Sequence, residues 1–148
     1  MRFLRANANT GPNTYGIDAS KIVLVGEGSG GYVSQAYISL DKAEEMFIEK
    51  FRPDPFTPSV SYIDTTIVGN IAGFGGSLNM YQDNGQSSAV QMAINIGGAL
   101  ADTSWADGGE VPLLSFQTVF DPFAPFGNGI VIVPTTGEQV VPVSGSTI

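Results

Sequence analysis

The residues best suited to chemistry stand in a glycine-rich turn and in one later acidic segment. The turn reads Gly26-Glu-Gly-Ser-Gly-Gly31, and Ser29 within it could act as a nucleophile if a base removed its proton. Asp121 could serve as the carboxylate that orients such a base. The chain has no histidine and no cysteine, which removes the usual general base, thiolate nucleophiles and disulfides. A complete Ser-His-Asp triad cannot be assembled from these residues alone.

The turn allows two interpretations, of which the first is a dinucleotide site. Gly26, Gly28 and Gly31 satisfy the pattern G-x-G-x-x-G, whose glycines admit a pyrophosphate at a helix N-terminus. That pattern also needs a second parallel strand that ends in an acid about 20 residues further on. The segment at that distance, AEEMFIEK, is typical of a helix and supplies no strand.

In the second interpretation the turn is a nucleophile elbow of the G-x-S-x-G kind, a sharp connection from a strand to a helix. Gly26 and Gly30 are then the outer glycines, and the central position falls on Gly28. The Ser29 hydroxyl is displaced by one residue, which on a sharp turn points it in a different direction. The alternative role of Ser29 is that of an N-terminal helix residue that satisfies backbone donors.

Asp121 and the other acids have alternatives to catalysis. Asp-Pro after a strand is a common turn, in which the carboxylate accepts hydrogen bonds from nearby backbone N–H groups. Asp102, Asp107 and Glu110 offer oxygen ligands for Ca²⁺, but their spacing does not match an EF-hand loop and favours a solvated acidic loop. We therefore expect no metal and no cofactor.

The glycine turn must be positioned by a strand before it and a helix after it. Residues 21–25 form an apolar, mostly β-branched run, which predicts a central parallel strand buried on both faces. Residues 32–51 contain no proline or glycine and predict a helix with a break near Asp41, which can cap the second half. Residues 2–8 predict another helical segment.

The rest of the chain predicts more strands and one irregular segment. Residues 90–96 and 111–116 indicate buried strands, and residues 129–133 and 139–143 indicate a hairpin. Residues 52–88 are rich in proline, glycine and asparagine and indicate an irregular connector or insert. We expect residues 1–148 to form a single α/β domain with a mostly parallel sheet and flanking helices.

Charge is distributed unevenly over the chain, whose net charge is −8. All six basic residues lie within the first 52 positions, and none follows. A region without Lys or Arg has nothing to hold phosphates, so we expect neither nucleic acid nor an anionic membrane as a partner, and a neutral rather than an anionic ligand. No apolar run approaches 18 residues, so no transmembrane helix is expected. The first residues lack the apolar core of a signal peptide, so an export signal would lie outside this chain.

Several segments, taken in order, resemble carboxylesterase-type α/β-hydrolases. The stretch RFLRANANTGPNTYGIDASKIVLVGEGSGGYVS is similar to the family's approach to its elbow, and AINIGGAL resembles a later strand. VPLLSFQTVFDPFAPFG resembles the strand and loop that carry the triad acid. Asp121 matches the acid, Pro125 the trailing proline, and Gln117 stands where the family often has histidine. The similarity covers most of residues 1–33 and 90–127.

The resemblance implies an α/β-hydrolase-like fold, truncated at its N-terminal side, that acts on a small neutral ester by serine-type acyl transfer. It assigns Ser29 as nucleophile, Asp121 as its carboxylate partner, and an elbow with oxyanion contacts to four glycines, Gly26, Gly28, Gly30 and Gly31. It also implies a secreted protein. The glycine at the elbow centre and the missing histidine put this activity in doubt.

A non-catalytic hydrolase-like domain for binding or assembly is the alternative. If no strand precedes residues 21–25, their strand exposes a parallel edge that could pair with another chain, which predicts a homo-oligomer or a paired partner. Nucleotide binding at the glycine turn is the third hypothesis.

Overall fold

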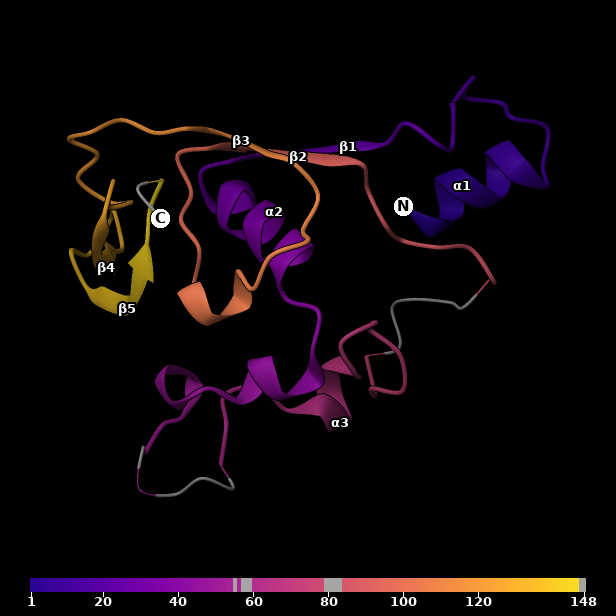
Figure 1. Ribbon diagram of the computed structural model, residues 1–148. Coiled ribbons are helices and arrows are strands. Elements are labelled where there is room, and N and C mark those ends of the chain that lie inside the picture. The colour runs from indigo at the N-terminus through magenta and orange to yellow at the C-terminus, as the bar shows by residue number, and fades with distance from the viewer. Residues whose placement is uncertain (55, 57–59, 79–83, 147–148) are drawn as a thin grey trace. The chain divides into compact units, whose positions relative to one another are not determined.

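In the computed structural model, whose ribbon is drawn in Figure 1, the chain forms two compact units. Unit 1 comprises Met1–Ile22 and Asp41–Ala89, and unit 2 comprises Val23–Leu40 and Val90–Ile148. The structure describes residues 1–54, 56, 60–78 and 84–146. The expected irregular segment 52–88 belongs to unit 1, and its residues 55, 57–59 and 79–83 lie outside the described part. A single domain over residues 1–148 stays a prediction.

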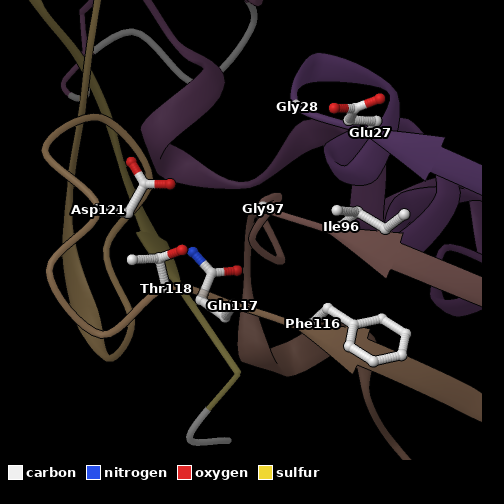
Figure 2. Close-up of a pocket in the computed structure, with 8 residues that line it drawn as sticks. All are labelled: Glu27, Gly28, Ile96, Gly97, Phe116, Gln117, Thr118 and Asp121. Atoms are coloured by element: carbon white, nitrogen blue, oxygen red, sulfur yellow. The ribbon is translucent and has the colours of Figure 1, made fainter.

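Unit 2 is an α/β arrangement around a three-stranded parallel sheet in the order β1-β2-β3. Its strands are β1 (Val23–Glu27), β2 (Met92–Ile96) and β3 (Leu113–Phe116), which confirms the three predicted strands within two residues at their ends. Because the strands are parallel, their last residues lie at one edge of the sheet (Figure 2).

The prediction that the first strand is central and buried on both faces is wrong. Among the described residues β2 pairs with a strand on each side, whereas β1 pairs with β2 alone. Val25 of β1 remains 58% exposed, while Ala93 and Asn95 of β2 are fully buried. A β-branched apolar run indicates a strand, but it does not reveal how many neighbours that strand has.

The helix predicted over 32–51 is confirmed in its first half and at the predicted break near Asp41, but its second half is not an α-helix. Helix α2 (Ser29–Ser39) follows the glycine turn and packs on β1 and β2. The chain is then extended at Leu40, and unit 1 continues with two short 3₁₀ helices, η1 (Ala43–Phe47) and η2 (Glu49–Phe51). The prediction that Asp41 caps the second half is wrong, because the residue at the N-cap of η1 is Lys42.

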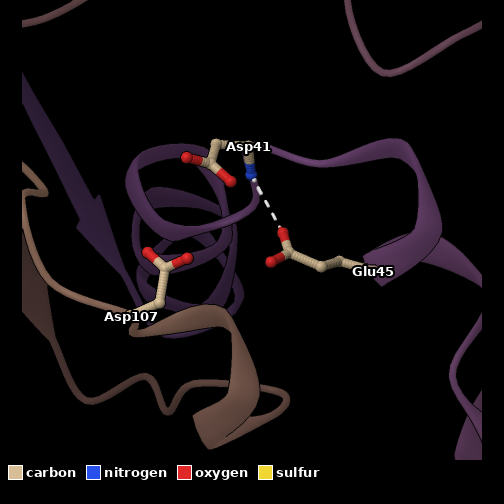
Figure 3. A group of neighbouring side chains, drawn as sticks. All are labelled: Asp41, Glu45 and Asp107. Carbon is tan, nitrogen blue, oxygen red and sulfur yellow. Dashed lines mark hydrogen bonds between the residues drawn. The ribbon is translucent and has the colours of Figure 1, made fainter.

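The carboxylate of Glu45 provides the cap instead. Its Oε2 accepts hydrogen bonds from the backbone N–H groups of Asp41 and Lys42, each at 3.1 Å; the bond from Asp41 is drawn in Figure 3. A residue inside the turn thereby satisfies donors that precede it, as in a capping box. This reverse bond closes a tight turn just after the predicted break, where the sequence pattern predicts that the helix resumes.

The C-terminal part of unit 2 contains the predicted hairpin. Strands β4 (Asn128–Ile132) and β5 (Gln139–Ser144) pair antiparallel. Paired backbone bonds between Leu100 and Ser144, at 2.7 and 2.8 Å, tie β5 to the segment after β2. That segment continues into η3 (Thr103–Trp105), which buries the chain's one tryptophan.

Unit 1 depends on a buried arginine in α1 (Arg2–Asn9), the helix expected near the start of the chain. The Arg5 guanidinium donates to the carbonyl oxygens of Ala19 at 3.2 Å, of Ala89 at 2.6 Å, and of Ser87. One side chain thus connects three segments of unit 1. The expected irregular segment contains the short helix α3 (Thr65–Val68), capped by Asp64. No helix among the described residues has the length and apolar character needed to cross a bilayer.

Replacing Arg5 with Met should destabilise unit 1. The substitution keeps an unbranched side chain but leaves three carbonyl oxygens without their charged donor, a loss of about 2–4 kcal/mol. Hydrogen exchange of the α1 amides measures this loss. Arg2→Met is the control, because among the described residues the Arg2 guanidinium makes one long bond, 3.4 Å to the Ala72 carbonyl, and lies over the Phe74 ring. Equal loss of protection in both variants would contradict the role given to Arg5.

Candidate functional site

The glycine turn has the shape of a sharp elbow between β1 and α2. Gly28 stands at its apex with φ 55° and ψ −119°, a backbone conformation that favours glycine. Its N–H donates to the carbonyl of Ile96 at 2.8 Å, and its carbonyl accepts from the N–H of Gly31 at 2.9 Å. The apex is therefore fixed both to the end of β2 and to the start of α2.

The turn is packed so closely that certain positions admit only glycine. A Cβ on Gly26 would lie 1.9 Å from the Gly30 carbonyl oxygen. A Cβ on Gly31 would lie 2.3 Å from Asn95 Oδ1, and one on Gly98 would lie 2.4 Å from the Gly31 carbonyl carbon. A Cβ on Gly30 would meet nothing within 4 Å, so of the outer elbow glycines only Gly26 is required by space.

Asn95 fixes the backbone that follows β2. Its side chain is fully buried, and its Nδ2 donates to the Gly98 carbonyl at 3.0 Å and to Ser115 Oγ at 2.8 Å. Its Oδ1 accepts from the Gly98 N–H at 2.8 Å. These bonds hold the turn in which Gly97 adopts φ 70°. Sequence reasoning missed Asn95, although a polar residue inside an apolar strand indicates a buried hydrogen-bonding role.

A pocket of about 480 Å³ lies at the carboxyl ends of the three parallel strands, within the size range of small-ligand sites. Figure 2 shows Gln117, Thr118 and Asp121 on one side of it. Ile96 and Phe116 lie on the other side. The pocket-lining residues are Glu27, Gly28, Ile96, Gly97, Phe116, Gln117, Thr118 and Asp121.

Asp121 faces the pocket with one oxygen committed to its own loop. Oδ1 accepts from the backbone N–H groups of Phe123 at 2.8 Å and Ala124 at 2.9 Å, which confirms the turn expected for Asp-Pro. Oδ2 lies toward Gly97, 3.9 Å from the position of a Cβ there, and makes no hydrogen bond with the described residues. The loop thus orients the carboxylate and leaves Oδ2 able to accept a hydrogen bond.

Gln117 is held by the same loop. Its Nε2 donates to the Ala124 carbonyl at 2.9 Å, while its Oε1 is buried and has no partner in the described part of the chain. The hydroxyl of Tyr32, in α2, is also buried and unpartnered there. Burial raises the pKa of Tyr32, and the negative charge of Asp121 raises it further, so this phenol stays protonated. Sequence reasoning did not single out Tyr32, because it stands inside a helical segment far from Asp121 in the chain.

The predicted catalytic residues are only partly brought together. Gly28 and Asp121 line the same pocket, whereas Ser29 begins α2, is exposed and is not among the lining residues. The Ser29 hydroxyl makes no hydrogen bond with the described residues, so none of them is placed as its base. The titratable side chains that line the pocket are the carboxylates of Glu27 and Asp121.

Comparisons of the chain with protein-family models, with curated proteins and with solved structures find no significant match. What the pocket does is therefore inferred from its own residues.

The close packing of the elbow predicts opposite results for two adjacent glycines. Gly31→Ala should lower the free energy of unfolding by about 1–3 kcal/mol, because the new methyl group overlaps Asn95 and Gly98. Gly30→Ala, which meets open space inside α2, should be neutral or stabilising by up to about 1 kcal/mol. Urea unfolding followed by Trp105 fluorescence measures both, and equal destabilisation would refute the packing argument.

Loss of the Asn95 side chain should loosen the turn that borders the pocket. Asn95→Ala leaves the Gly98 N–H and carbonyl without their partner, at a cost of about 1–3 kcal/mol, and should speed hydrogen exchange at the Gly98 amide. Asn128→Ala is the matched control, because the Asn128 side chain is exposed and, among the described residues, accepts one bond, from Ser144 Oγ. Unchanged exchange at Gly98 would show that Asn95 does not hold the turn.

Proposed function

We propose that unit 2 is a hydrolase-like domain of the carboxylesterase type that binds a small, non-anionic ligand without acyl transfer by this chain's own residues. The observation that carries the proposal is the glycine at the apex of the elbow. Gly28 keeps the conformation that would present a nucleophile beside the pocket, but it has no side chain to present.

Acyl transfer needs a base within hydrogen-bond reach of the nucleophile. The Ser29 hydroxyl has no such contact within the described residues, and the chain contains no histidine. Loss of a triad member lowers acyl-transfer rates by several orders of magnitude. A ligand in the pocket would therefore be bound and released rather than turned over.

Binding is supported by the composition of the pocket. Ile96 and Phe116 offer apolar surface, and Gln117, Thr118 and Asp121 offer polar groups, a combination common in small-ligand sites. The N–H groups of Ser29 and Gly30, the first two of α2, have no carbonyl partner within the helix and could donate to the carbonyl oxygen of an ester.

Serine-type ester hydrolysis is the second candidate. Ser29 would be the nucleophile and Asp121 the carboxylate partner, and what favours this function is the exposure of Ser29 next to pocket-lining Gly28. The base would then come from another chain. Nucleotide binding has less support, since β2, the next parallel strand, ends in Ile96 and is followed by Gly97 rather than an acid.

Ester binding and ester turnover can be measured separately. We expect wild type, Ser29→Ala and the control Ser104→Ala to hydrolyse p-nitrophenyl acetate at the same near-background rate. Titration with ethyl butyrate should shift the amide NMR signals of Gly28 and Gly97, which border the pocket. Hydrolysis that disappears only in Ser29→Ala would establish the second candidate, and unmoved glycine signals would refute ligand binding.

A further inference from the structure

We propose that the pocket of unit 2 prefers a small ligand that carries a primary ammonium group, with Asp121 as its principal counter-charge. This inference rests on the binding function proposed above and adds the charge and donor chemistry of the ligand. Three features of the pocket carry it: an oriented carboxylate, a second free carboxylate, and an acceptor without a donor.

Asp121 is prepared to receive a cation. Two backbone N–H groups hold its Oδ1 and so fix the plane of the carboxylate, while Oδ2 faces Gly97 without a partner among the described residues. A ligand N–H that reaches Oδ2 forms a charge-assisted hydrogen bond, which is stronger than a neutral one. The orientation is already fixed before binding, so little side-chain freedom is lost.

Glu27 adds a second negative charge to the same pocket. Its side chain is exposed at the end of β1, and its carboxylate makes no ion pair or hydrogen bond with the described residues. Unit 2 contains no Lys or Arg that could neutralise either carboxylate. Its acidic residues are Glu27, Asp102, Asp107, Glu110, Asp121 and Glu138.

Gln117 indicates that the ligand brings hydrogen-bond donors. Its Nε2 is used by the Ala124 carbonyl, which leaves Oε1 as a buried acceptor with no partner among the described residues. An unpaired buried acceptor is costly, and a ligand donor that met Oε1 after a rotation of the Gln117 side chain toward the pocket would recover part of that cost. A primary ammonium group has three donors, enough for Asp121 and Gln117 together.

The N-terminus of α2 opposes this preference but does not cancel it. A helix N-terminus acts as about half a positive charge and attracts anions. The carboxylates of Glu27 and Asp121 together carry up to two full negative charges at the same pocket. The balance favours a cation, while the alkyl part of the ligand has Ile96 and Phe116 to contact.

Three ligands with one common alkyl group separate charge from shape. They are 3,3-dimethylbutylamine, 3,3-dimethylbutan-1-ol and 3,3-dimethylbutyrate, each titrated into the full chain while the Gly28 and Gly97 amide signals are followed. The amine should bind at least about tenfold more tightly than the alcohol, and the carboxylate should bind most weakly. Raising the salt concentration should lower the affinity for the amine and leave the affinity for the alcohol unchanged.

Variants then assign the charge. Asp121→Asn keeps the oxygen that accepts from Phe123 and Ala124, and should lower amine affinity about tenfold without affecting the alcohol. Glu27 is exposed, so Glu27→Gln should lower amine affinity by less than Asp121→Asn. It provides the test if the Asp121 variant fails to fold. Glu138→Gln removes one negative charge outside the pocket and should leave the affinities for the amine and the alcohol unchanged.

The outcomes separate this inference from the proposed function. Equal affinity for amine and alcohol would overturn the ammonium preference and leave ligand binding intact. Amine binding that is unchanged in both Asp121→Asn and Glu27→Gln would also overturn it. If none of the three ligands moves the glycine signals, the ammonium proposal fails, and the ester titration decides the proposed function separately.

Discussion

Unit 2 depends on a contact between two stretches of backbone. Gly31 in α2 and Gly98 after β2 approach so closely that neither could carry a Cβ without overlapping the other's backbone. This contact places the start of α2 against the end of β2, and Asn95 secures it by bonding Gly98 on both its N–H and its carbonyl. The elbow and the Gly97 turn consequently meet at one edge of the sheet, where the pocket lies.

Much of this arrangement is predictable from sequence, because it follows from local patterns. Apolar runs locate the three parallel strands, and two further runs around a Pro-to-Gly turn locate the hairpin of β4 and β5. Two features were missed. The edge position of β1 is set by which strands pair with it, and these are distant in the chain. After the predicted break near Asp41, 3₁₀ turns replace the expected second half of the helix, and the Glu45 carboxylate closes the first of them.

The candidate site was partly predictable for the same reason. Gly28 and Asp121 follow strand ends, so parallel pairing brings them to one edge. Tyr32 and Asn95 have roles that arise only from three-dimensional packing. The buried hydroxyl of Tyr32 lies close enough to Asp121 for its charge to raise the Tyr32 pKa, and the buried amide of Asn95 in β2 bonds Ser115 of β3. The uneven distribution of charge along the chain also corresponds to the division into two units. All six basic residues belong to unit 1, so the charged side chains that unit 2 itself contributes to its pocket are both carboxylates, Glu27 and Asp121.

Gly28 has the backbone conformation of a nucleophile elbow but no side chain that could act as a nucleophile. A residue with a side chain would be strained at φ 55°, and such strain is maintained where a side chain must be presented. Glycine removes the strain together with the side chain, yet the surrounding packing of Gly26, Gly31 and Gly98 is still required. That packing fixes the positions of Gly28 and Gly97, which line the same pocket as the oriented carboxylate of Asp121. An elbow of this shape is therefore evidence for a site, and the residue at its apex decides what the site can do.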